Sequence, residues 1–269
     1  MKKQIGNIYR YVIIIRNRIQ WMWESIYEKR KIKPVDNLKQ NFSGICLILI
    51  PHSDDEWIGC SRIITNCKNV VLCNMDMSGD DSDSLHQERY IEMQSVQKVY
   101  KHQLITIKDN KVDCLNALIK EVTPDFIFIP HFIDWHPEHI EVMRILSLTL
   151  KKITDNHIII VMYQVSCPIL SGITHAIPMS KKEWHLKWKF FKKHYPSQLC
   201  IPYRRFSLNE VINGKYTKSY AAEVFCSLSS EEWINKIAGE GLNVEQINSL
   251  MHNLSSISKM RSYIKNEFA

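Results

Sequence analysis

Short, wholly apolar runs alternate with amphipathic stretches from residue 44 onward, and this alternation constrains the fold more than any other feature. Ile45–Ile50 is apolar at every position, as expected for a strand that is buried on both faces of a sheet. Further apolar runs occur at 70–75, 104–107, 126–129 and 157–165, with helix-like stretches between them at 56–66, 84–100, 113–122 and 137–151. This order predicts βαβ units with right-handed crossovers. We therefore expect an α/β fold, with a Rossmann-like, mostly parallel sheet and helices on both faces.

The chain divides into three segments around this pattern. Residues 44–228 form the predicted α/β domain, which includes a basic helix at 181–194 and a strand at 220–228. Residues 229–269 are a C-terminal helical extension, and the Ser-Ser-Glu-Glu run at 229–232 is typical of a capping box. Residues 1–43 form a basic, amphipathic N-terminal segment.

The N-terminal segment contains one apolar burst, Tyr11–Ile15, which is too short for a signal peptide or a membrane span. A helix from about Ile8 to Tyr27 would carry one apolar stripe among basic residues: Val12, Ile15, Ile19, Met22 and Trp23. Such a helix either docks on the domain or lies on a membrane surface. We favour docking and keep peripheral membrane contact as the alternative.

The charge distribution and the cysteines indicate which partners and which cellular compartment to expect. The formal net charge is +7, but the basic residues are scattered and match no nucleic-acid-binding motif, so we expect no nucleic-acid partner. The eight cysteines contain no Cys-x-x-Cys pair, which favours free thiols in a reducing compartment. We expect a cytoplasmic protein, or one at the inner face of the membrane if the N-terminal segment binds lipid.

Two clusters of histidine and carboxylate follow the first and fourth predicted strands. The first is Pro-His-Ser-Asp-Asp-Glu at 51–56, and the second runs from Pro130 through His136, Pro137 and Glu138 to His139. Ligands bind at the carboxyl ends of the strands in an open α/β sheet. The two clusters are therefore expected to meet at one sheet edge.

The residue types in these clusters suit a catalytic metal ion. Adjacent Asp54 and Asp55 must diverge, so that one can bind a metal while the other faces a substrate. His136 stands where a helix cap is expected, with Pro137 at the first helical position, and His139 follows on the same side of the opening turn. Two imidazoles and one carboxylate leave open positions on a divalent ion, as in catalytic zinc sites. Either cluster alone would equally suit a simple helix start.

This pair of motifs resembles the LmbE/PIG-L-like N-acetylsugar deacetylases, which carry a His-Pro-Asp-Asp-Glu-like loop and a His-Pro-Asp-His-like helix start. The resemblance extends over residues 44–228. Weaker parts of it are Gly79 in an acidic loop, Arg89-x-x-Glu92, the segment from Tyr195 to Gln198, and Ala222-Glu223-x-Phe225.

The resemblance implies a role for each residue. His52, Asp55 and His139 would hold one divalent ion per chain, zinc or in its place Fe²⁺. Asp54 would be the general base, and His136, as an imidazolium, would stabilise the oxyanion. Two residues depart from the family pattern: Ser53 replaces Pro, which should loosen the loop, and Glu138 replaces Asp.

The implied function is a zinc-dependent hydrolase that removes the N-acetyl group from a sugar or sugar conjugate, such as N-acetylglucosamine, in bacterial surface-polysaccharide or glycolipid biosynthesis. We expect Arg89, Asp134 and Gln198 to bind this substrate. The alternatives are a non-catalytic sugar- or nucleotide-binding module, and a deacylase of another amide, such as a thiol precursor or an antibiotic intermediate. The loop after the first strand has only Gly59 and no glycine triad, which disfavours a pyrophosphate cradle.

Overall fold

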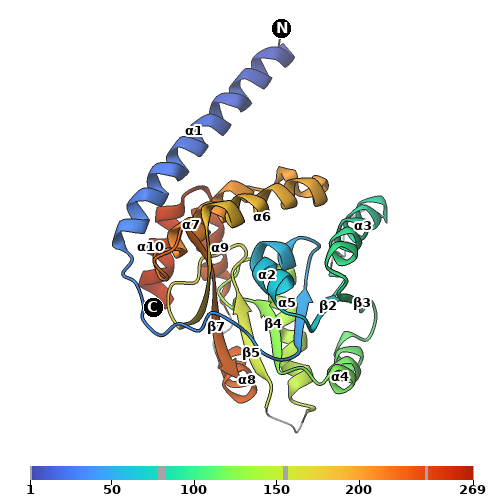
Figure 1. Cartoon of the computed structure of the whole chain (residues 1–269). Coiled ribbons are helices and arrows are strands. Elements are labelled where there is room, and N and C mark those ends of the chain that lie inside the picture. The colour runs from blue at the N-terminus through green and yellow to red at the C-terminus, as the bar shows by residue number, and fades with distance from the viewer. Residues whose placement is uncertain (1, 78–82, 154–156, 240–241, 269) are drawn as a thin grey trace.

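A seven-stranded sheet forms the centre of the protein (Figure 1). The structure is a computed structural model and describes residues 2–77, 83–153, 157–239 and 242–268. The strand order is β3-β2-β1-β4-β5-β7-β6. The strands are β1 (Cys46–Ile50), β2 (Val70–Asn74), β3 (Gln103–Thr106), β4 (Phe126–Pro130), β5 (Ile159–Tyr163), β6 (Ile173–Met179) and β7 (Ala221–Ser229).

The first five strands are parallel, and β7 runs antiparallel to both of its neighbours, β5 and β6. The expected Rossmann-like, mostly parallel sheet is therefore confirmed. Each of the predicted strands is present, with ends shifted by one or two residues. The strand β6 was not predicted because it contains Pro178 and His175, and a proline is tolerated there since β6 lies at the edge of the sheet.

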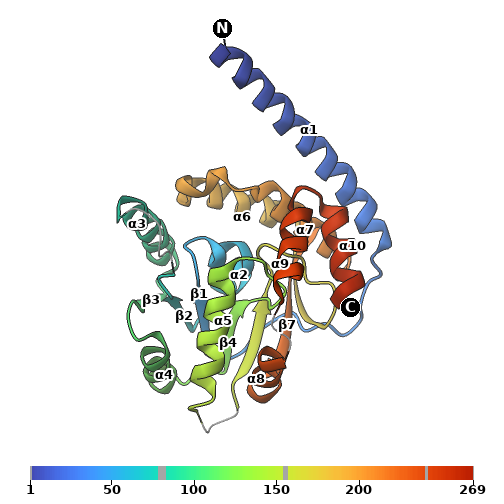
Figure 2. The ribbon, with the colours of Figure 1, turned by 180° about the vertical axis from the view of Figure 1, so that it is seen from behind.

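The apolar run of β1 explains why helices cover both faces of the sheet. Leu47 and Leu49 pack in one core cluster with residues of α4 (Lys111–Val122), α5 (Pro137–Leu150) and α8 (Ser230–Gly239). Ile48 and Ile50 pack in a second cluster with residues of α2 (Asp55–Asn66), α3 (Asp83–Tyr100) and α6 (Lys181–His194). Figure 2 shows α5 in front of the sheet and α2 behind it.

The segment after α6 contains a helix that the sequence does not reveal. The 3-10 helix η1 (Pro196–Cys200) leads into α7 (Tyr203–Asn213). The buried residues of α7 are mostly polar, among them Arg205, Asn209, Glu210 and Asn213, so no apolar stripe marks this helix. α7 lies between α1 (Lys2–Lys31) and the sheet, and contacts both α1 and β7.

The two terminal segments pack against each other (Figure 1). After β7 the C-terminal segment forms α8, α9 (Val244–His252), η2 (Asn253–Ser255) and α10 (Ile257–Phe268). The expected capping box of α8 is present: Glu232 N donates to Ser229 Oγ, and Ser229 N donates to Glu232 Oε2. The expected N-terminal helix is longer than predicted, and its second half lies against α7 and α10. In the described part of the chain, every helix is too short or too polar to cross a membrane.

A buried cation fixes α2, the helix that begins at the first motif. Lys187 on α6 is 4% exposed, and its Nζ donates to Ile58 O (2.7 Å), to Glu223 Oε1 (2.6 Å) and to Glu210. Burial alone would lower the pKa of Lys187, but the two carboxylates outweigh it and raise the pKa. The carbonyl of Ile58 is available because α2 is kinked at Cys60.

We expect Lys187→Met to destabilise the protein by about 3–5 kcal/mol, because it leaves Glu210 and Glu223 buried without a counter-charge. Urea unfolding followed by circular dichroism measures this change. Lys189→Met, at an exposed position of the same helix, is the matched control and should change stability by less than about 0.5 kcal/mol. Equal, small effects of both substitutions would contradict the role given to Lys187.

Candidate metal and active site

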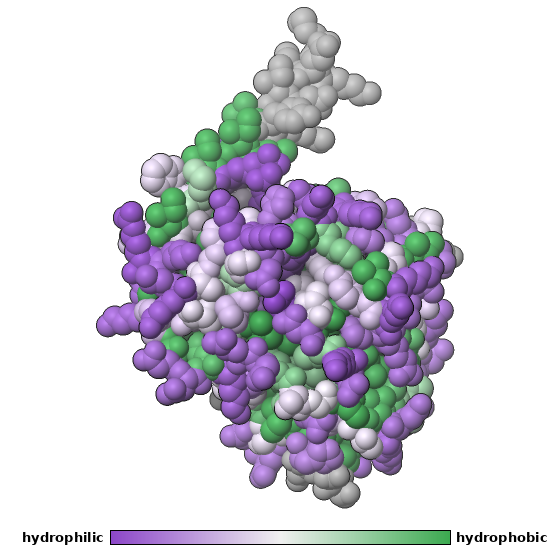
Figure 3. Space-filling model, viewed as in Figure 1, coloured by the Kyte–Doolittle hydropathy of each residue, from purple (hydrophilic) through white to green (hydrophobic). Residues whose placement is uncertain are grey.

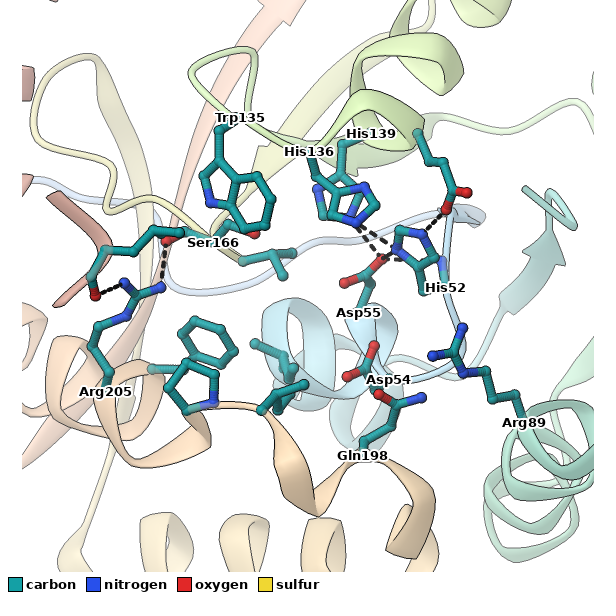
Figure 4. A pocket seen from close by; sticks show the side chains of 17 residues that line it. His52, Asp54, Asp55, Arg89, Trp135, His136, His139, Ser166, Gln198 and Arg205 are labelled. Carbon is teal, nitrogen blue, oxygen red and sulfur yellow. Dashed lines mark hydrogen bonds and ion pairs between the residues drawn. The ribbon is translucent and has the colours of Figure 1, made fainter. Parts of the chain in front are cut away.

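Two loops at the carboxyl ends of neighbouring parallel strands build the site (Figure 4). The loop after β1 carries His52 and Asp54 and leads into α2, whose first residue is Asp55. The loop after β4 leads into α5, with His136 as its N-cap and His139 in its first turn. The sequence therefore predicted correctly that the two clusters meet at one sheet edge.

Three side-chain atoms from the two loops form a small triangle. His52 Nδ1 lies 3.2 Å from Asp55 Oδ2 and 3.2 Å from His139 Nε2, and His139 Nε2 lies 3.1 Å from Asp55 Oδ2. Ligand atoms about 2.1 Å from a tetrahedral zinc ion lie about 3.4 Å from one another. The triangle therefore fits the face that three protein ligands present to such an ion, with a fourth position left open.

A carboxylate holds the outer nitrogen of each of these imidazoles. His52 Nε2 contacts Glu138, and His139 Nδ1 lies 3.1 Å from Asp134 Oδ2. Such carboxylate partners fix the orientation and tautomer of a metal-binding histidine and raise its basicity. The Glu that departs from the family pattern at 138 thus supports the site.

Asp134 does not lie where a substrate-binding residue was expected. It is 1% exposed and lies behind the histidines, where Oδ1 accepts the backbone N–H of His136 (3.0 Å). Because both carboxylate oxygens contact the loop that carries His136 and His139, Asp134 orients that loop. The spacing of Asp134 from the histidines in the sequence does not distinguish this role from substrate binding.

Charge is concentrated in the triangle. Burial would raise the pKa of Asp55, but His139 and His52 outweigh it and hold the pKa below its ordinary value. Burial would lower the pKa of His139, but Asp55 and Asp134 outweigh it and raise the pKa well above the ordinary value. The donor set of two imidazoles and one carboxylate suits zinc or iron.

His136 is the third imidazole of the site. Its ring centroid lies 4.5 Å from that of His52, and ring nitrogens of His52, His136 and His139 come within 4.8 Å of one another. These three histidines can therefore also hold a metal ion. Asp55 Oδ2 lies closer to the ring nitrogens of His52 and His139, at 3.2 and 3.1 Å, than the 4.8 Å limit within which the three histidines come together.

His136 was expected to be a positively charged imidazolium, and this expectation is wrong for the protein without a bound ion. Burial, together with the neighbouring His52 and His139, lowers the pKa of His136 to about 4. The side chain is therefore a neutral imidazole at neutral pH instead of an imidazolium. Its Nδ1 is buried and has no hydrogen-bond partner within the described residues.

Asp54 has a strained backbone at the entry to α2. Its φ of 141° and ψ of −28° are unusual for a residue other than glycine, and such strain is found where a site needs it. Glu56 Oε2 accepts the Asp54 N–H (3.0 Å), and Glu56 Oε1 accepts the hydroxyl of Tyr195 (2.5 Å). Burial, then Asp55 and Glu56, raises the pKa of the Asp54 carboxyl well above its ordinary value.

The residues of the weaker motifs brace these loops. Ser53 Oγ donates to Arg89 O (2.7 Å), so the serine that was expected to loosen the loop ties it to α3. Glu92 accepts both the N–H and the hydroxyl of Ser197. Glu223 accepts Ser61 Oγ (2.5 Å) in α2. Gly79 lies outside the described residues.

A cavity of about 490 Å³ opens onto the triangle, within the roughly 300–1,000 Å³ of pockets that enclose a drug-sized ligand. His52, Asp54, Asp55, His136 and His139 line it together with Arg89 and Gln198, so seven of the eight predicted site residues share one cavity (Figure 4). The rest of the wall is mostly apolar: Ile58, Trp135, Val165, Ile201, Pro202, Phe206 and Leu254.

The apolar side of the cavity comes from regions that sequence reasoning left without a role. Arg205 of α7, which is 3% exposed, donates to Ser166 O (3.3 Å) and to Leu254 O. It thereby joins the segment after β5 to the C-terminal extension, which supplies Leu254 to the wall. No motif marked Arg205, because an Arg-Arg pair between Tyr203 and Phe206 matches no known pattern.

The fold is shared with solved deacetylases. Over 68% of this chain and 94% of the other, it is similar to the conserved protein TT1542 from Thermus thermophilus, with 15% identity and a TM-score of 0.54. It is similar to a deacetylase of the teicoplanin biosynthetic pathway at 12% identity, with coverage of 70% and 99% and a TM-score of 0.53. It is similar to the A40926 pseudoaglycone deacetylase Dbv21 at 12% identity, over 68% of this chain and 97% of the other, with a TM-score of 0.50.

These likenesses establish the fold, which is that of the LmbE-like (PIG-L) deacetylases and confirms the fold expected from the motifs. At such low identity they do not carry a substrate over to this chain. No protein-family model matches the sequence, and no curated protein matches it.

We expect Ala substitutions of His52, Asp55 or His139 to abolish binding of the single divalent ion, since each removes one corner of the triangle. His136→Ala should keep it. Elemental analysis of the purified proteins measures the metal content, and His185→Ala, at an exposed position of α6, is the control. Metal lost from His136→Ala but retained by Asp55→Ala would instead identify the three-histidine cluster as the site.

Proposed function

We propose that this protein is a zinc-dependent hydrolase that removes the N-acetyl group from an N-acetylated sugar or sugar conjugate. The observation that carries the proposal is the triangle of His52 Nδ1, Asp55 Oδ2 and His139 Nε2 on the wall of a cavity that Asp54 also lines. A metal site with an open position next to a spare carboxylate is an arrangement that suits the hydrolysis of an amide.

His52, Asp55 and His139 would hold the ion, with iron as the alternative to zinc. When bound, such an ion acts as a Lewis acid that makes water more acidic and polarises an amide carbonyl. Glu138 and Asp134 keep the two imidazoles in place from outside. The low pKa of Asp55 keeps it an anionic ligand at neutral pH.

Asp54 is the general base in this proposal. Its carboxylate takes a proton from the attacking water, the new C–O bond forms at the carbonyl carbon, and the proton then passes to the amide nitrogen as the C–N bond breaks. The products are acetate and a free amine. The hydrogen bond from Asp54 N–H to Glu56 holds the loop so that the carboxylate faces the cavity.

His136 stabilises the charge that develops on the carbonyl oxygen. As a neutral imidazole it donates through one N–H, so the hydrogen bond lacks the assistance of a full positive charge. A single donor of this kind still contributes about 100- to 1,000-fold in turnover. The ring of His136 lines the cavity beside the imidazoles of His52 and His139, which supports this assignment.

The cavity wall supports a sugar that carries a further group. Arg89 and Gln198 offer polar contacts near Asp54, and the apolar wall extends to Phe206 and Leu254. A monosaccharide alone would leave that wall uncovered. A conjugate made during surface-polysaccharide or glycolipid assembly in the bacterial cytoplasm would fill both parts.

The alternatives differ in what the cavity must bind. A nucleotide-binding module needs an anion site at the start of α2, but this start carries Asp54, Asp55 and Glu56, whose charges repel phosphate. A deacylase of an antibiotic intermediate or a thiol precursor would use the same chemistry, and the fold is shared with deacetylases of teicoplanin and A40926 pseudoaglycone. Only the substrate separates these two from a sugar deacetylase.

An acetate-release assay of the zinc-loaded protein, over a panel of N-acetylated sugars, glycoconjugates and non-sugar amides, tests the proposal. We expect turnover of the sugar conjugates and a fall of about 100- to 10,000-fold in Asp54→Asn, which loses the base but keeps the ion. Asp109→Asn, at an exposed position before α4, is the matched control and should be fully active.

Release of acetate only from the non-sugar amides would replace the sugar by those substrates. No release from any of them, by protein that contains its ion, would refute the proposed hydrolase.

A further inference from the structure

The N-terminal helix α1 docks on the protein through its polar face. Trp21 Nε1 donates to Ser255 O (2.8 Å), Glu24 accepts the hydroxyl of Ser256 (2.7 Å) and the N–H of Ile257 (2.6 Å), and Glu28 is 6% exposed. Positions 21, 24 and 28 lie on one face of a helix because they are three and four residues apart. Glu24 also places a negative charge at the start of α10, where the helix dipole favours it.

The opposite face of α1 is apolar and largely exposed, and two of its residues, Ile19 and Met22, also line a pocket with residues of α6 and α7. Val12, Ile15, Ile19, Met22, Trp23 and Ile26 follow helical spacing and are 57%, 54%, 49%, 48%, 64% and 41% exposed. Figure 3 shows hydrophobic side chains gathered along the projecting part of this helix. A docked helix normally buries its apolar stripe, so this inverted arrangement indicates that the stripe has another partner.

Charge identifies the partner as an anionic surface. α1 carries eight lysines and arginines but only two acidic residues, Glu24 and Glu28. Both glutamates are turned toward the protein, and Arg16 and Arg18 beside the stripe are exposed. A second copy of the chain would bring like charges together on this face, whereas anionic lipid headgroups complement the basic rim of an apolar stripe.

We propose that α1 lies in the interface of an anionic lipid bilayer, with its apolar face among the headgroups and its polar face on the protein. This proposal goes beyond the hydrolase function and does not depend on it. The helix does not have the length of apolar sequence needed to cross the bilayer. The contact of Trp21 with Ser255 joins α1 to the segment whose Leu254 lines the cavity. Only α1 and this segment would therefore separate the lipid surface from the cavity.

Co-sedimentation of the full chain with lipid vesicles tests the proposal. We expect the protein to sediment with phosphatidylcholine vesicles that contain phosphatidylglycerol, and to be released by high salt. The variant Ile15→Asp/Ile19→Asp/Trp23→Asp should bind at least about 10-fold more weakly, since it removes apolar contact and adds negative charge. Val244→Asp is the control, because Val244 is 72% exposed on α9.

The three substituted side chains are exposed, so the variant should unfold at the same temperature as the wild type. Absence of vesicle binding by the wild type, equal binding by the triple variant, or equal binding to vesicles of pure phosphatidylcholine would each overturn the proposal. A wild-type dimer that the triple variant converts to a monomer, without vesicle binding, would show that the face joins two copies of the chain.

Discussion

The carboxylate of Asp55 joins the two strand ends from which the site is built. Its Oδ2 accepts the backbone N–H of His52 (3.0 Å) and lies within 3.2 Å of the imidazoles of His52 and His139. A carboxylate that is 3% exposed is costly to bury without positive partners. The loop after β1 and the first turn of α5 must therefore stay in contact for either to be stable, and an ion at their junction would satisfy the remaining charge.

Three buried glutamates hold the elements around this junction. Glu56 binds the Asp54 N–H and the Tyr195 hydroxyl, Glu92 binds Ser197, and Glu223 binds α2 and Lys187. Each of them connects α2 or α3 to a segment more than 100 residues away in sequence, and the unusual backbone of Asp54 persists because of these connections. These hydrogen bonds explain motifs that are weak in isolation. Glu92 of Arg89-x-x-Glu92 accepts hydrogen bonds from Ser197, which lies in the segment from Tyr195 to Gln198.

The sheet and the position of the site followed from the sequence because each depends on a strong local pattern. Wholly apolar runs predict strands buried on both faces, and parallel strands bring their carboxyl ends to one edge. α7 and its Arg205 could not be predicted, since the inner face of this helix is polar. The sequence could not show that Asp134 stands behind His139, because sequence spacing does not say on which side of a histidine a nearby carboxylate lies.

In the N-terminal helix, hydrophobic periodicity predicts the apolar stripe but does not predict which face of the helix contacts the protein. Its residues 12, 15, 19, 22 and 23 form the apolar stripe that the spacing predicts, and the helix docks on the protein as expected, but through a different face. The contacts of Trp21 and Glu24 lie on the other face. Hydrogen bonds to Ser255 and Ser256, more than 230 residues away, decide the orientation, and no local pattern reveals them.

An anomalous difference map from crystals of the zinc-loaded protein, measured at the zinc absorption edge, would show directly which side chains bind the ion. We expect one peak about 2.0–2.2 Å from His52 Nδ1, Asp55 Oδ2 and His139 Nε2, with the ring of His136 beyond bonding distance. A peak bound by three imidazoles, with His136 as a ligand and Asp55 displaced, would contradict this expectation.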